Sequence, residues 1–111
     1  MPFSEKRKYE RKPYVKPLKY YLTDSHMDKL EVKEIEYEGV SVDICEGGIG
    51  MITAYPLNEG DTLFFKDEIK VNNLIATSGV VKWLQRLADT TYRLGLEFSD
   101  VCLHREHGLI L

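Results

Sequence analysis

Long hydrophobic runs are missing from this sequence of 111 residues. A membrane-spanning helix needs about 20 consecutive apolar residues, and because no such run occurs we expect no membrane span. Charged residues occupy the N-terminus without the apolar stretch that follows them in a secretory signal, so we expect no such signal. Only two cysteines occur, Cys45 and Cys102, which do not make a disulfide framework. A cytoplasmic, reducing environment fits this composition.

Signatures of catalytic, metal and phosphate-loop sites are also missing. No arrangement of Ser, His and Asp and no pair of carboxylates stands out, so we expect no enzyme activity. His104 and His107, together with Cys102, are too few to close a metal site, and we expect no metal. The glycines of segment 47–50 are not followed by the Gly-Lys-Ser/Thr of a phosphate loop. They also lack the third glycine and the long helix of a dinucleotide fingerprint.

Charge is distributed unevenly along the chain. Residues 1–20 hold seven basic and two acidic side chains, a net charge of +5, whereas the other 91 residues hold eight basic and 16 acidic ones, a net charge of −8. We therefore expect a flexible basic arm over residues 1–12 and one acidic domain over residues 13–111. Such an arm either binds an anionic partner or rests on its own acidic body.

Hydrophobic alternation predicts short strands separated by turns. The clearest pattern runs from Tyr92 to Phe98, and the other predicted strands are 14–22, 40–45, 51–55, 63–65, 69–75 and 79–84. Ser99 or Asp100 is expected to cap a short C-terminal helix that ends at Gly108. Many short strands without a long helix predict an all-β fold, either a barrel or a sandwich.

Two short segments carry the residues that we expect to bind a ligand. Arg7 and Arg11 are four positions apart, a spacing that directs both guanidinium groups to one side in a helix or in an extended arm. Asp43 ends an alternating strand just before a glycine-rich turn at Gly47 and Gly48, where a ligand can approach the backbone closely. The opposite face of that strand is expected to hold three apolar side chains: Val40, Val42 and Ile44.

The chemistry of these two segments suits a guanine nucleotide. Arginine donates in one plane to phosphate or to O6 and N7 of guanine. An ionised carboxylate only accepts, so it suits the N–H groups on the other edge of the base.

At this point the sequence resembles the PilZ domain family. The first ligand motif of that family, Arg-x-x-x-Arg on an N-terminal arm, is matched by Arg7 and Arg11. The second, Asp/Asn-x-Ser-x-x-Gly, is matched at its ends by Asp43 and Gly48. Segments 79–83 and 92–98 look like later strands of the family, so the resemblance covers about residues 5–99.

The resemblance implies a six-stranded antiparallel β-barrel that binds the bacterial second messenger cyclic di-GMP. It also implies a receptor without catalytic activity, and we expect no cofactor. Because the ligand bears two negative charges, we expect the basic arm to become ordered when it binds and to pass the signal to a downstream protein. The implied ligand-binding residues are Arg7, Arg11, Asp43, Cys45, Gly47 and Gly48.

One departure from the family pattern is Cys45, which stands where the family has serine. A thiol is the weaker hydrogen-bonding group, and the loss of one such bond costs about 0.5–1.5 kcal/mol, so we expect weakened binding. Two alternatives stay open. One is a protein-interaction adaptor that binds no nucleotide, and the other is a non-specific nucleic-acid binder, which the acidic body disfavours.

Overall fold

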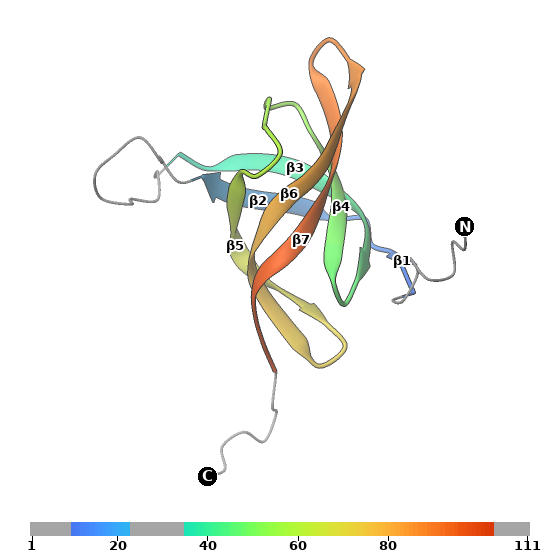
Figure 1. Ribbon diagram of the computed structural model, residues 1–111, viewed down its shortest axis with the longest axis vertical. Helices are drawn as coiled ribbons and strands as arrows, with labels where there is room; N and C mark the ends of the chain where they lie inside the picture. Colours follow the sequence, from blue (N-terminus) through green and yellow to red (C-terminus); the bar gives the residue numbers. More distant parts are fainter. Residues whose placement is uncertain (1–9, 23–34, 104–111) are drawn as a thin grey trace.

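The computed structural model describes residues 10–22 and 35–103, and these residues form strands, turns and loops (Figure 1). The strands are β1 (Lys12–Pro13), β2 (Pro17–Leu22), β3 (Tyr37–Cys45), β4 (Gly48–Thr53), β5 (Thr62–Val71), β6 (Leu74–Ala88) and β7 (Thr91–Leu103). Within these two ranges no helix has the length and apolar character needed to cross a bilayer.

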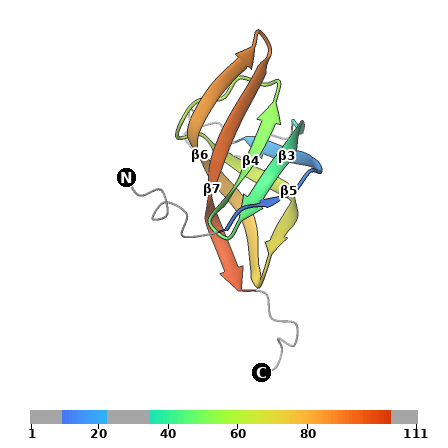
Figure 2. The ribbon, with the colours of Figure 1, turned by 90° about the vertical axis from the view of Figure 1, so that its right-hand side faces the viewer.

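The main sheet closes on itself as a six-stranded antiparallel barrel. The strands follow the order β3-β2-β5-β6-β7-β4, and β4 pairs again with β3. β1 lies beside the same edge of β3 that β2 occupies, further along the strand. The barrel can be followed in two views, in which the β6–β7 hairpin extends beyond its rim (Figures 1 and 2). This closure confirms the all-β barrel that the resemblance implied.

Apolar side chains from the barrel strands fill the interior. The largest that are fully buried are Tyr20, Ile49, Met51, Leu63, Leu94 and Val81. Full burial of one such aliphatic side chain stabilises the fold by roughly 1.5–3 kcal/mol. In β7 the predicted alternation is confirmed, because Leu94, Leu96 and Phe98 belong to the core. Alternation therefore leaves Arg93 and Gly95 on the outer face of the barrel.

An extra residue in β3 changes which of its side chains face outward. The pairing register of β3 with β4 shifts between Ser41 and Asp43. Before the shift Ser41 is buried and Val40 is 45% exposed, whereas after it Ile44 belongs to the core. The prediction that Val40, Val42 and Ile44 share one face was therefore wrong, because a bulge reverses the alternation. The same bulge keeps Asp43 on the outer face, as predicted.

The short C-terminal helix was predicted wrongly at its start. Ser99 and Asp100 belong to β7, which continues to Leu103 and pairs there with Leu74 of β6. In this extension the backbone N–H and C=O groups find their hydrogen-bond partners in β6, so a helix is not needed to satisfy them. The predicted helix end at Gly108 lies outside the described residues.

Candidate functional site

A cavity of about 470 Å³ opens on the outer side of the barrel, over β3, β4, β7 and β6. Its volume falls in the range of about 300–1,000 Å³ that is usual for small-molecule sites. Five of the six residues predicted to bind a ligand line it: Arg11, Asp43, Cys45, Gly47 and Gly48. The sixth, Arg7, lies outside the described residues. The structure thus brings residues from two distant segments to one cavity, while their role in binding stays a prediction.

The floor of the cavity is made of glycine. In the strand register Asp43 pairs with Gly50, Gly50 pairs with Gly95, and Gly95 pairs with Trp83. Asp43 and Trp83 thus stand on opposite sides of two residues that have no side chain. A Cβ atom on Gly50 would lie 2.7 Å from Oδ1 of Asp43, so the carboxylate needs glycine at this position. The two glycines thus leave room above the backbone for the carboxylate of Asp43 and for the side chain of Trp83.

Trp83 faces the cavity because of an irregularity in β6. The pairing register with β7 shifts between Val81, which is buried, and Trp83. As a result Lys82 and Trp83 are both exposed, and Trp83 retains 44% of its accessible surface. The indole lies against Gly95, where an added Cβ atom would overlap its Nε1 atom. An indole held in this way offers a surface for stacking a planar ring.

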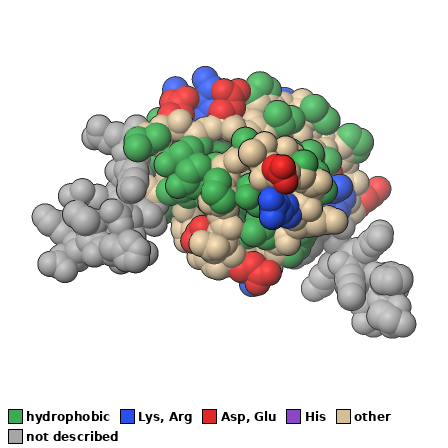
Figure 3. All heavy atoms as spheres, turned by 90° about the horizontal axis from the view of Figure 1, so that it is seen from above, with side chains coloured by type: hydrophobic (Ala, Val, Ile, Leu, Met, Phe, Trp, Pro, Cys, Tyr) green, Lys and Arg blue, Asp and Glu red, His purple; other side chains and the backbone are tan. Residues whose placement is uncertain are grey.

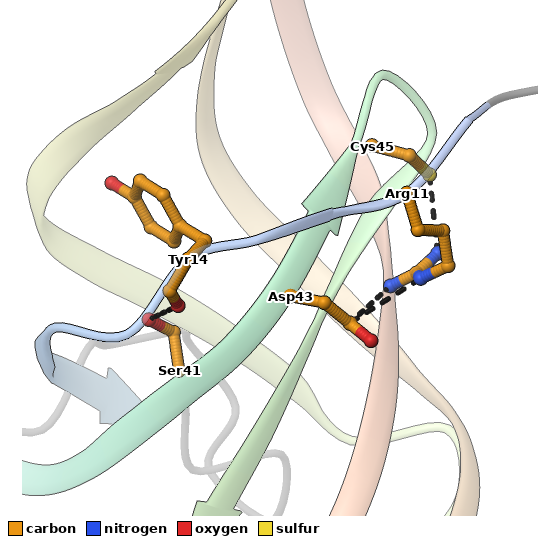
Figure 4. Close-up of polar contacts among 5 residues, drawn as sticks. All are labelled: Arg11, Tyr14, Ser41, Asp43 and Cys45. Carbon is orange, nitrogen blue, oxygen red and sulfur yellow. Dashed lines mark hydrogen bonds and ion pairs between the residues drawn. The ribbon is translucent and has the colours of Figure 1, made fainter.

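Arg11 reaches the cavity because β1 extends the edge of β3. Lys12 and Pro13 pair with Ile44 and Asp43, which places the preceding residue beside the carboxylate. Nη2 and Nε of Arg11 donate to Oδ1 of Asp43 at 2.9 and 3.3 Å. Nη1 donates to Sγ of Cys45 at 3.1 Å (Figure 4). A guanidinium has five N–H groups, so two remain for a ligand.

The side chains that line the cavity carry a net positive charge and include both donors and acceptors, which suits an anion that also has hydrogen-bonding groups. The cations Arg11, Lys82 and Arg93 outnumber the carboxylates of Asp43 and Glu97. Lys82 pairs with Glu97 at 3.3 Å. The side chains of Arg11 and Asp43 are 44% and 28% exposed, so water screens their ion pair, and such pairs contribute only about 0–1 kcal/mol. A ligand can therefore rearrange this pair at small cost.

One donor at the cavity lacks an acceptor. Nε of Arg93 is buried and has no hydrogen-bond partner among the described residues. A buried donor left in this state costs roughly 1–3 kcal/mol, so the side chain of Arg93 gains if it turns toward an acceptor.

Sequence reasoning did not assign Lys82, Trp83 or Arg93 to the site. Arg93 could have been assigned from the sequence, because its alternation with Leu94 places it on the outer face of the barrel. Trp83 could not have been assigned in this way, since its exposure results from an irregularity at Lys82 that depends on how β6 pairs with β7.

The described residues offer little else for ligand chemistry. Within residues 10–22 and 35–103, no three His, Cys, Asp or Glu side chains are close enough to hold a metal. Cys102 is an exposed free thiol, and His104 and His107 lie outside the described residues. On the face seen in Figure 3, described basic and acidic side chains lie side by side among apolar ones. This arrangement differs from the continuous basic stripe of a nucleic-acid-binding surface.

Comparison with known proteins gives one match. A family model described as PilZ domain matches residues 5–109, which is nearly the whole chain. No curated protein and no solved structure matches the chain significantly. The match extends beyond the segment of about residues 5–99 over which the sequence itself showed the resemblance.

Proposed function

Because the chain belongs to the PilZ domain family, which comprises cyclic di-GMP-binding modules, we propose that it is a cyclic di-GMP receptor. The carrying observation is that Arg11, Asp43 and Trp83, from three separate parts of the chain, line one glycine-floored cavity. The family is a family of ligand-binding receptor domains rather than of enzymes. The proposed role needs only binding and a response to it.

The proposed contacts follow from the donor and acceptor groups of the ligand. The carboxylate of Asp43 accepts from N1–H and the exocyclic amine of a guanine. The two N–H groups that Arg11 does not use internally donate to a phosphate or to O6 and N7 of guanine. Trp83 stacks on a base, and the guanidinium of Arg93, which lines the cavity, donates to a phosphate oxygen.

The thiol of Cys45 has a defined place in this proposal. It accepts from Nη1 of Arg11 at 3.1 Å, so it helps to hold the guanidinium beside Asp43. Serine would make the same contact with a stronger acceptor. The substitution therefore weakens the proposed site without removing any of its charges.

The proposed response concerns the basic arm. Arg7, which lies outside the described residues, would supply the second guanidinium of the motif. We propose that the two negative charges of the ligand draw the residues before Glu10 onto the cavity, which creates a surface for a downstream protein. Fixing each residue costs roughly 1–2 kcal/mol of conformational entropy, so the ligand contacts of the arm must offset that amount.

Thermal unfolding tests the receptor against the competing adaptor role. A ligand that binds the native state raises its stability by RT ln(1 + [L]/Kd), about 2.7 kcal/mol at a hundredfold excess over Kd. We expect cyclic di-GMP to raise the midpoint of unfolding, with GMP as the control ligand. An unchanged midpoint at millimolar cyclic di-GMP would favour a protein-interaction adaptor that binds no nucleotide.

A further inference from the structure

The β1 and β2 strands lie along one edge of β3 and are separated by residues 14–16. This gap lies opposite the bulge of β3 at Ser41 and Val42. Two backbone hydrogen bonds cross it: the N–H of Tyr14 donates to the carbonyl of Val42, and the N–H of Ser41 donates to the carbonyl of Lys16, both at 2.9 Å. The bulge therefore adds an attachment of the N-terminal segment to the barrel, between the pairings of β1 and β2 with β3.

The hydroxyl of Ser41 adds a second attachment at the same point. Oγ donates to the carbonyl of Tyr14 (Figure 4). It also accepts from the N–H of Lys16 at 3.1 Å. Only 1% of Ser41 is exposed, so water cannot replace these bonds without opening the structure. Loss of the hydroxyl would leave a backbone donor and a backbone acceptor without their partner.

This attachment lies three residues from Arg11. The β1 strand between them has only two residues, Lys12 and Pro13, and Pro13 has no N–H to donate to a ladder. The position of Arg11 therefore depends strongly on what holds residues 14–16. Its own contacts with Asp43 are solvent-facing and weak.

We propose that Ser41 is a positioning residue for the ligand site: it fixes residues 14–16 on the β3 bulge, so that β1 presents Arg11 to Asp43 and Cys45. The ligand in this inference rests on the proposed function. The placement of Arg11 is independent of the proposed function, and it can be measured in the protein without ligand.

The test uses Ser41→Ala, with Ser78→Ala as the matched control. Ser78 is also buried, at 4% exposure, and its hydroxyl bonds to that of Ser99 at 2.9 Å, away from residues 14–16. Ser41→Cys, which nearly keeps the side-chain volume, serves if the alanine variant does not fold. Two readouts are needed: amide hydrogen exchange at Tyr14 without ligand, and calorimetric affinity for cyclic di-GMP in the wild-type and Arg11→Ala backgrounds.

We expect Ser41→Ala to speed exchange at Tyr14 by about fivefold or more, the change that corresponds to loss of one hydrogen bond. We expect a similar loss of affinity in the wild-type background, little further loss in the Arg11→Ala background, and no such effects from Ser78→Ala. A merely structural role would weaken binding equally in both backgrounds, and that result or unchanged exchange at Tyr14 would overturn the inference. If the wild type binds no cyclic di-GMP, the proposed function fails, and the exchange rate of Tyr14 alone decides whether Ser41 positions the segment.

Discussion

Arg11 donates two hydrogen bonds to a single oxygen of Asp43, 32 positions away in the sequence, at 2.9 and 3.3 Å. Within the described part of the chain, both donors fall on Oδ1, so the second carboxylate oxygen remains available to a ligand. The pair thus brings together the two segments that the sequence marked as ligand-binding. Because this pair is exposed to solvent and weak, a ligand can separate the two groups at small cost and use the donors and acceptors that they release.

Replacing Arg11 by alanine should weaken binding of cyclic di-GMP by about 1–3 kcal/mol, the scale of one bidentate guanine contact. The matched control is Arg86→Ala, which removes the same charge at the exposed end of β6, where Arg86 pairs with Asp89. Calorimetry should show a loss for the first variant and nearly wild-type affinity for the second. Equal losses in both would mean that general charge, rather than this contact, attracts the ligand.

Gly50→Ala should impair binding while the fold persists. The added Cβ atom would meet the end of a flexible side chain, Oδ1 of Asp43 at 2.7 Å, so the carboxylate and Arg11 must move aside. Gly48→Ala is the informative contrast, because its Cβ atom would meet the backbone carbonyl of Leu96. Overpacking against backbone should cost about 1–3 kcal/mol of stability or more. Urea unfolding and calorimetry on both variants separate these effects, and the prediction is wrong if Gly50→Ala binds like the wild type.

Trp83 is the only tryptophan of the chain, so its fluorescence reports directly on the cavity. If a guanine stacks on the indole, titration with cyclic di-GMP should change the emission with the same midpoint as the calorimetric curve. Trp83→Ala should lose about 1–3 kcal/mol of binding free energy, the usual value for one stacked base. Trp83→Phe should lose less, since a planar ring is retained. Calorimetric binding without any change in emission would place the ligand elsewhere.

The sequence predicted those features that depend on local periodicity. The alternation from Tyr92 to Phe98 identified the centre of β7, whose residues Leu94, Leu96 and Phe98 belong to the core. The convergence of Arg11 and Asp43 could not come from periodicity, because it joins segments 32 positions apart. It followed from the family motifs, which the barrel topology explains by pairing β1 with β3.

The features that sequence reasoning missed arise from pairing between strands. The backbone at the Ser41 bulge is hydrogen-bonded to residues 14–16, and no local pattern encodes that distant partner. The exposure of Trp83 likewise depends on the register of β6 against β7. The helix expected at Ser99 was overridden by continued pairing with β6, which satisfies the backbone over a longer segment than a cap does.

Cys45→Ser should bind cyclic di-GMP at least as tightly as the wild type. Sγ of Cys45 accepts from Nη1 of Arg11, and a hydroxyl oxygen is the better acceptor. The expected gain is at most about 0.5–1.5 kcal/mol, which calorimetry can measure. Cys102→Ser, at an exposed thiol on β7, controls for the loss of a thiol as such. Weaker binding by Cys45→Ser would show that the thiol has a role beyond accepting this bond.

Stability at acid pH should depend on Glu36. The hydrogen bond from Lys66, at 3.1 Å, and the nearby charge of Lys19 lower the pKa of this carboxyl below its ordinary value of 4.5. A pKa lowered in the folded state stabilises the protein above the unfolded-state value, and this contribution is lost as pH falls through the folded-state value. Glu36→Gln should therefore flatten the fall in unfolding midpoint below about pH 5. Glu59→Gln, at an exposed loop carboxyl, should leave the profile unchanged, and an identical profile for Glu36→Gln would refute the prediction.

Residue-resolved NMR during titration with cyclic di-GMP examines the proposed site most directly. The amide signals of Gly48, Gly50 and Gly95 and the indole N–H signal of Trp83 should move together and saturate, because these groups line the cavity. The buried amide of Ser78, on the far part of β6, should stay in place as an internal reference. If saturating ligand moved none of the three glycine signals, or moved only signals outside the cavity, the proposed receptor site would be wrong.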